Sequence, residues 1–413
     1  MLYGAPFLAI AGTLATGALA FSALGYDGLG AVRQLVWEPL AGPERWPDLL
    51  IKAGPLILIA VGLSAGFRAG VWNIGAEGQY LAGAIAGTGV ALATWGLEGG
   101  WILPLMALAG IAGGMAWAAA PAFLRTRFGV SEILSSLMLT YVAIQLLYGL
   151  VRGPWRDPEG FNFPQTRLFT PSQTLPAVSE GSLIHLGIPL AVAAALVAWF
   201  LLERTLLGFA VKTVGLAPAA ARHGGFRESG VVWGTMLVGG GLAGLAGLLE
   251  AAGPFGQLTP QFPAGYGYTA IIVAFLGRLH PLGIVLAALV LAVTYVGGER
   301  AQTALGLPQA AAGAFQASLL FWLLAADVLV RYRVVWRPRS QARCRHSISP
   351  GTPSPGRRFA ALDLSPLGRG VEVTALSTGD PSPRRGEVES AAAAAEPGEG
   401  APKPERAAGG SRT

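Results

Sequence analysis

The sequence predicts an all-α polytopic membrane protein with about ten transmembrane helices, and three observations support this. Hydrophobic residues make up 53% of the 413 positions and charged residues only 13%, about half of the share that soluble domains carry. The charges are clustered, so apolar runs near the roughly 20 residues needed to cross a bilayer remain between them. Glycine is abundant, with 59 residues, and small residues allow membrane helices to approach closely.

Apolar runs separated by charged breaks give ten candidate spans. They are Tyr3–Leu24, Leu50–Phe67, Glu77–Trp95, Trp101–Leu124, Ser131–Leu150, Ile184–Leu202, Gly230–Glu250, Tyr266–Gly277, Pro281–Gly297 and Ala310–Val330. The eighth is too short to cross a bilayer alone, so we expect a broken or re-entrant segment buried in protein or lining a cavity. No cleavable signal sequence is expected, because nothing basic precedes the first apolar run and that run is long enough to span.

The basic residues orient the predicted bundle, since cytoplasmic loops of membrane proteins carry an excess of Lys and Arg. One side holds most of them: Arg68, Arg125, Arg127, Arg204, Lys212, Arg222, Arg227, Arg278, Arg331, Arg333, Arg337 and Arg339. This asymmetry predicts that both termini lie in the cytoplasm. It also makes Gly153–Ser182 the largest external loop.

The composition changes abruptly near the end of the chain. Residues 337–413 are rich in Pro, Gly, Ser, Arg and Ala and contain the only cysteine, Cys344. Such a segment cannot bury a core, so we expect a transmembrane domain over 1–336 and a disordered low-complexity tail over 337–413. A regulatory or lipid-contacting role for this basic tail stays open. A single cysteine excludes a disulfide framework within one chain.

Several polar residues fall within or beside the apolar spans, where an unpaired charge is costly. Glu77 is the strongest candidate: its carboxylate either caps the helix that it begins, fixing the preceding turn, or contacts solute. The candidates for a translocation path or a structural polar cluster are Asn73, Glu77, Gln79, Gln145, Glu250, Gln257 and Gln316. Gln257 lies in a Pro- and Gly-rich stretch before a half-length apolar helix, an arrangement that builds solute sites in transporters but also occurs in ordinary external loops.

Glycines spaced four apart indicate where helices cross closely. The pairs are Gly83 and Gly87, Gly110 and Gly114, and Gly240 and Gly244. We interpret them as packing positions rather than as chemical groups of a site.

The segment WNIGAEGQ, which contains Asn73, Glu77 and Gln79, resembles the signature of permeases from ABC importers for nucleosides and simple sugars. These permeases belong to the broader branched-chain amino acid and ribose permease superfamily. The resemblance continues through Ser131–Ala143, Glu203–Phe226 and Gly265–Leu289.

This resemblance implies a membrane-spanning subunit of an ATP-driven importer in the bacterial cytoplasmic membrane, taking up nucleosides or simple sugars by alternating access. It implies four partners: an ABC ATPase subunit that holds ATP-Mg, a second permease subunit in a heterodimer, an extracytoplasmic solute-binding lipoprotein and membrane lipid. No nucleic acid, cofactor or metal is expected on this chain, and it is not expected to be an enzyme. None of its three lysines follows glycine in a phosphate-binding loop pattern.

Pro218–His223 is predicted to be a short helix, because Pro is favoured at its first position and Gly224 and Gly225 can end it. The resemblance implies that it is the coupling helix that docks on the ATPase. The residues implied are Gly215, Pro218, Ala220, Ala221, Arg222 and Gly225. Ala217 and Ala219 depart from the polar and acidic residues of many relatives. Without the resemblance, a plain basic cytoplasmic loop would be the simpler interpretation.

Three alternatives remain from the sequence. A permease of the same superfamily could carry branched-chain amino acids. An ion-coupled secondary transporter would favour charged intramembrane pairs and inverted repeats, and a membrane-embedded enzyme would need a polar catalytic cluster at one face.

Overall fold

The computed structural model describes residues 5–177, 184–263, 265–306, 308–334 and 364–366. Its contacts divide the chain into two compact units, Met1–Ser365 and Pro366–Thr413, and all the helices among the described residues belong to the first. The predicted tail, 337–413, lies outside the described residues except for 364–366, and so does Cys344. Disorder of this tail therefore stays a prediction.

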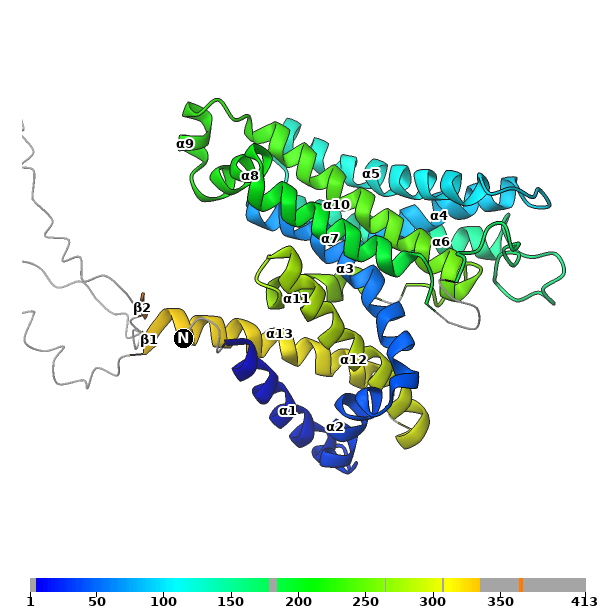
Figure 1. The fold of residues 1–413 in the computed structure, drawn as a ribbon, viewed down its shortest axis with the longest axis horizontal. Coiled ribbons are helices and arrows are strands. Elements are labelled where there is room, and N and C mark those ends of the chain that lie inside the picture. Colours follow the sequence, from blue (N-terminus) through cyan, green and yellow to red (C-terminus); the bar gives the residue numbers. More distant parts are fainter. Residues whose placement is uncertain (1–4, 178–183, 264, 307, 335–363, 367–413) are drawn as a thin grey trace, which may run out of the picture. The chain divides into compact units, whose positions relative to one another are not determined.

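The described part of the first unit is mainly helical (Figure 1). Its α-helices are α1 (Ala5–Ala23), α2 (Gly28–Val36), α3 (Trp46–Arg68), α4 (Ala76–Ala93), α5 (Ile102–Phe128), α6 (Glu132–Arg152), α7 (Gly187–Arg204), α8 (Leu206–Leu216), α9 (Pro218–His223), α10 (Glu228–Glu250), α11 (Tyr266–Leu276), α12 (Pro281–Leu305) and α13 (Gln309–Arg331). Two short 3-10 turns, η2 (Glu38–Leu40) and η3 (Pro43–Arg45), precede α3. A π-helical turn, η4 (Ala251–Phe255), continues α10. Two three-residue strands are β1 (Tyr332–Val334) and β2 (Leu364–Pro366).

Six helical segments of the described residues are long and apolar enough to cross a membrane. They are Trp46–Arg68, Ile102–Phe128, Glu132–Arg152, Gly187–Arg204, Glu228–Phe255 and Pro281–Leu305. The predicted all-α membrane class is therefore confirmed. Helices α8 and α11 and parts of α1 and α13 are shorter apolar helices, so the count of about ten spans stays a proposal.

The glycines predicted to mark close crossings lie where α4, α5 and α10 meet. A Cβ atom built on Gly83 would lie less than 3.0 Å from the backbone of Gly244, and one built on Gly244 would lie less than 3.0 Å from the backbones of Gly110 and Gly114. The backbones of three helices thus approach so closely that no side chain fits between them. The close crossings predicted from the glycine spacing are confirmed.

Helix α3 is largely buried and packs against α7, α10, α11 and α12. Leu56 and Ile59 near its centre have no exposed surface. Helix α1 packs along α13, where the indole Nε1 of Trp322 donates to Thr16 Oγ1 at 3.3 Å. Helix α2, which the apolar runs did not predict, packs against α12.

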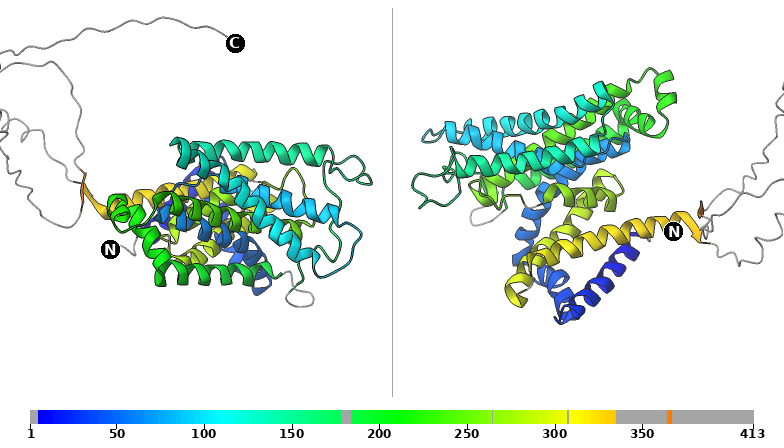
Figure 2. Two further views of the ribbon diagram at one scale, coloured as in Figure 1. Left: turned by 90° about the horizontal axis from the view of Figure 1, so that it is seen from above. Right: turned by 180° about the vertical axis from the view of Figure 1, so that it is seen from behind.

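The two ends of the α3–α10 bundle differ. Helices α8 and α9 lie at one end, and the loop that follows α6 lies at the other (Figures 1 and 2). This loop covers the connection from α10 to α11: Phe169 N donates to Gly256 O at 2.8 Å, and Thr166 N donates to Leu258 O at 3.0 Å. At the end of this loop, His185 Nδ1 accepts the N–H of Gly187 at 3.1 Å.

Candidate solute cavity and coupling helix

The turn between α3 and α4 is fixed by a pair of buried amides. Asn73 Nδ2 donates to Gln79 Oε1 at 2.9 Å, and Gln79 Nε2 donates to Asn73 Oδ1 at 3.2 Å. The same Asn73 oxygen accepts the N–H of Gly75 at 3.1 Å. Two of the candidate path residues therefore bind each other, and neither lines the cavity described below.

Glu77 does not cap the helix that it begins. The N-cap of α4 is Gly75, without a side-chain cap, whereas the Glu77 carboxylate accepts the N–H groups of Gly265 at 2.9 Å and Gly267 at 2.6 Å. Both lie at the start of α11, so Glu77 caps a helix almost 190 residues further along the chain. The expectation that Glu77 caps its own helix is wrong.

The contact between the Glu77 carboxylate and the N-terminus of α11 is electrostatically favourable. The N-terminus of a helix carries a partial positive charge and free N–H groups, which favour a carboxylate. Gly265 adopts φ 77°, a left-handed conformation that favours glycine. A Cβ on Gly267 would lie less than 3.0 Å from the backbone of Glu77. Two glycines therefore allow α11 to begin directly against α4.

A cavity of about 670 Å³ lies among α3, α11, α12 and α13. Its lining residues include three tyrosines, three glutamines, a threonine and one lysine–glutamate pair among apolar side chains. The rings of Tyr266 and Tyr295 form part of its wall, with centroids 5.2 Å apart and planes tilted by 45°.

Polar groups in the cavity wall are linked by hydrogen bonds across three helices. Thr269 Oγ1 on α11 lies 2.8 Å from the hydroxyl of Tyr295 on α12, and it donates to Gln316 Oε1 on α13 at 3.4 Å. Gln316 Nε2 donates in turn to Thr294 Oγ1 at 3.2 Å. The Gln316 amide thus accepts one hydrogen bond and donates one. An amide can make further bonds through its oxygen and its NH₂ group, which a bound solute can use.

The charges that line the cavity are paired. Lys52 Nζ on α3 lies 3.0 Å from Glu299 Oε1 on α12. With one cation and one anion in contact, the described lining has no net charge. The cavity therefore suits a neutral solute better than an ion.

Glu250 is buried behind the cavity wall at the end of α10. Its Oε1 accepts the hydroxyl of Tyr266 at 3.3 Å, whereas its Oε2 has no hydrogen-bond partner among the described residues. The π-helical turn η4 begins at the next residue, and such turns are frequent at functional sites. Glu250 thus positions Tyr266 rather than lining the cavity itself.

The remaining candidate path residues are three glutamines, and they differ in their position relative to the cavity. Gln316 lines the cavity, whereas Gln145 is exposed on α6 and Gln257 is partly buried after η4. Sequence reasoning missed Lys52, Tyr295 and Thr269 as lining residues. The tyrosines of the segment GYGYTA were a usable signal, because a buried phenol hydroxyl needs a polar partner.

Helix α9 has the local structure that its sequence predicts. Pro218 begins it, Gly225 adopts φ 82° after it, and the bonds from Gly225 N to Arg222 O (3.1 Å) and from Phe226 N to Ala221 O (3.0 Å) form a Schellman motif. The short helix and its glycine stop are confirmed.

The faces of α9 differ from the expected docking surface in one respect. Ala221 is buried, with 1% of its surface exposed, whereas Pro218, Ala220 and Arg222 are exposed. Ala221 therefore packs against its own chain, whereas Pro218, Ala220 and Arg222 are available to a partner. Gly215 lies on α8, where a Cβ would lie less than 3.0 Å from Arg68 O.

Residues 47–324 match the family model described as the permease component of the branched-chain amino acid transport system. The chain belongs to this family. The permease is 39% identical to a glucose ABC transporter permease protein of Haloferax volcanii, over 81% of this chain and 90% of the relative. It is 31% identical to a guanosine ABC transporter permease protein of Bacillus subtilis, over 73% of this chain and 87% of the relative. It is 27% identical to a nucleoside ABC transporter permease protein of Lactococcus lactis, over 78% of this chain and 91% of the relative.

No solved structure matches the chain. The relatives nevertheless establish its class: it is the membrane-spanning permease subunit of an ABC importer, a transport component. The alternative of an ion-coupled secondary transporter is not supported.

Proposed function

We propose that this permease carries a neutral nucleoside or simple sugar through the cavity among α3, α11, α12 and α13. The observation that carries the proposal is the lining itself: three tyrosine rings, linked hydroxyl and amide groups, and a lysine whose charge is balanced by a glutamate at 3.0 Å. Binding sites for small molecules combine apolar and aromatic walls with a few placed polar groups. Tyrosine rings suit the flat face of a nucleobase or sugar, and the amide and hydroxyl groups suit its hydroxyls.

A branched-chain amino acid fits this lining less well. Its carboxylate and ammonium groups would each need a charged or strongly polar partner to leave water, whereas Lys52 and Glu299 already neutralise each other. The glucose, guanosine and nucleoside permeases among the relatives support the same choice of solute class.

The energy for uptake comes, in this proposal, from partner ATPase subunits that bind ATP-Mg, while this chain binds no cofactor. A second permease subunit completes the pathway in a heterodimer, and an extracytoplasmic lipoprotein delivers the solute. The permease lies in the bacterial cytoplasmic membrane with both termini in the cytoplasm. In the ten-span arrangement α11 is the half-length, broken segment, and it lines the cavity. Alternating access follows when closure of the ATPases moves α9.

The exposed face of α9 gives a direct test of coupling. In the Ala220→Glu variant we expect the ATPase subunit to co-purify with the permease about tenfold less, and uptake to fall with it, because a buried charge without a partner destroys an interface position. Membrane abundance should stay unchanged, since Ala220 is exposed. Co-purification on a tagged permease and uptake by the same cells measure both effects.

Two further variants make this test specific. Ser229→Glu adds the same charge at an exposed position at the start of α10 and should change neither co-purification nor uptake. Ala221→Glu should lower membrane abundance as well, because Ala221 is buried within the chain. Normal co-purification and uptake by Ala220→Glu would show that α9 is not the docking element.

A further inference from the structure

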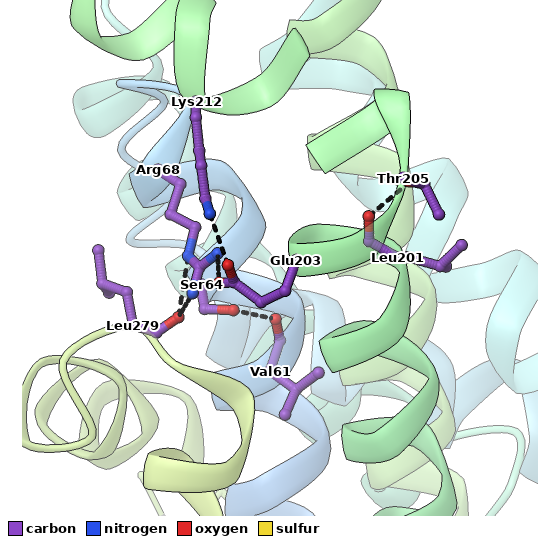
Figure 3. Close-up of polar contacts among 8 residues, drawn as sticks. All are labelled: Val61, Ser64, Arg68, Leu201, Glu203, Thr205, Lys212 and Leu279. Atoms are coloured by element: carbon purple, nitrogen blue, oxygen red, sulfur yellow. Dashed lines mark hydrogen bonds and ion pairs between the residues drawn. The ribbon is translucent and has the colours of Figure 1, made fainter. Parts of the chain in front are cut away.

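A three-residue ion cluster joins four segments at the end of the bundle where α8 and α9 lie (Figure 3). Arg68 Nη1, at the end of α3, lies 2.6 Å from Glu203 Oε1 at the end of α7. Lys212 Nζ on α8 lies 2.6 Å from Glu203 Oε2. Glu203 thus uses one carboxylate oxygen for each cation, and it links α8 to α3.

The other nitrogens of Arg68 bind the turn between α11 and α12. Arg68 Nε and Nη2 both donate to Leu279 O, at 3.0 and 2.7 Å. In this turn Arg278 and Leu279 have φ values of 54° and 57°, a left-handed conformation that is unfavourable for residues other than glycine. The fork of donors on Arg68 thus holds the end of α11 in a conformation that it would not favour alone.

The turn that Arg68 holds is continuous with the solute cavity. Phe275, near the end of α11, stacks on Phe67 with ring centroids 5.2 Å apart. Thr269 and Ile272, within two turns of helix before it, line the cavity. Because α11 is only 11 residues long and begins against Glu77, a shift of its end is carried to the cavity wall.

The same ion cluster is connected to the proposed docking helix α9 through α8, which carries Lys212. Helix α9 begins two residues after α8 ends, and α8 lies so close to α3 that no Cβ fits on Gly215 beside Arg68 O. The helices α8 and α9, residues 206–223, form an arm. Its contacts with the rest of this end include the ion pair of Lys212 with Glu203, the close approach of Gly215 to Arg68 O, and Val211 packed beside Ala69 and Val71. A displacement of this arm acts on Glu203 and Arg68 before it reaches α11.

We propose that Arg68, held by Glu203, is the positioning residue that passes movement of the α8–α9 arm to α11 and so to the solute cavity. This inference rests on the proposed function, and it adds the path by which docking at α9 changes the cavity. Neither Arg68 nor Lys212 was among the path or coupling residues expected from the sequence.

The test uses the complete importer, with its ATPase subunits and binding protein, in proteoliposomes. ATP hydrolysis and uptake of labelled guanosine or glucose, whichever the wild type imports, are measured in the same vesicles. For Glu203→Gln, which keeps the side-chain volume but removes both ion pairs, we expect solute imported per ATP hydrolysed to fall about tenfold, within the range typical of linked sites. Hydrolysis itself and co-purification of the ATPase should persist.

Lys212→Met removes only the ion pair between the α8–α9 arm and Glu203, and leaves the pair of Glu203 with Arg68 intact. It should lower the same ratio, and Lys212→Arg should restore it, because an arginine can still reach Glu203. Since the Lys212 side chain is 41% exposed, this variant gives a result even where Glu203→Gln lowers abundance. The control is Asp48→Asn, which breaks the 3.6 Å pair of Asp48 with Arg300 between α3 and α12 and should leave the ratio unchanged.

An unchanged ratio in both Glu203→Gln and Lys212→Met would overturn the inference. So would a fall in uptake and hydrolysis together, in proportion to lost abundance, because that is the result of a structural role alone. A wild-type importer that takes up no nucleoside or sugar would instead contradict the proposed function. The two failures are therefore distinguishable.

Discussion

The Glu77→Gln variant is expected to lose thermal stability and membrane abundance, although its side chain has almost the same shape. Both carboxylate oxygens of Glu77 accept backbone N–H groups, from Gly265 and Gly267. A glutamine offers one oxygen, and its NH₂ group would face the second N–H. A buried donor left without an acceptor costs about 1–3 kcal/mol. Glu77→Ala leaves both N–H groups unpaired and should be less stable still.

Two measurements test this: the unfolding temperature of the purified permease in detergent, and its abundance in the membrane. Both should be highest for the wild type, lower for Glu77→Gln and lowest for Glu77→Ala. Glu228→Gln is the matched control, because Glu228 also lies in the first turn of a helix but is exposed. If Glu77 fixed only its own turn, the amide would keep most of the stability. Normal stability of Glu77→Gln with altered solute selectivity would place Glu77 in the solute site instead.

Gly244→Ala is expected to destabilise the permease by about 1–3 kcal/mol or more, the usual cost of overpacking a close contact. A single methyl group at this position would lie less than 3.0 Å from the backbones of Gly110 and Gly114. These are backbone atoms of α5, so the two helices must separate. Because α4, α5 and α10 all meet here, their separation weakens the bundle at its centre.

The same helix provides the control for this substitution. A Cβ on Gly234, also on α10, meets nothing within 4 Å, and alanine favours a helix over glycine by about 1 kcal/mol. Gly234→Ala should therefore keep or slightly raise the unfolding temperature, measured in the same detergent. Equal unfolding temperatures for the two variants would contradict the close packing of α10 on α5.

Local signals explain what the sequence could predict. Apolar runs bounded by charges gave the position of α11, since the expected Tyr266–Gly277 corresponds to the observed Tyr266–Leu276. Glycines four apart gave the crossings of α4, α5 and α10. Pro218 and Gly225 gave the start and stop of α9. In each case the residues that decide the structure are neighbours in the chain.

Features that depend on contacts between distant segments could not be predicted from the sequence. The cost of burying a carboxylate identified Glu77 as important, but its partners lie 188 and 190 residues away. The cavity wall comes from four helices, so no single stretch of sequence shows that Gln316 lines it while Gln145 does not. Helix α9 has too few residues for a periodic pattern to show that Ala221 faces inward.

The measurement that tests the central claim most directly is the affinity of ATP-dependent uptake for a panel of labelled nucleosides and hexoses, compared between Gln316→Leu and Gln145→Leu. Gln316 lines the cavity and Gln145 is exposed on α6. Loss of one hydrogen bond of about 1 kcal/mol corresponds to about a fivefold change, so Gln316→Leu should raise the KM for uptake about fivefold at unchanged abundance. Gln145→Leu should leave the KM as it is. An unchanged KM in Gln316→Leu, or a raised KM in Gln145→Leu alone, would contradict the assignment of this cavity to the solute.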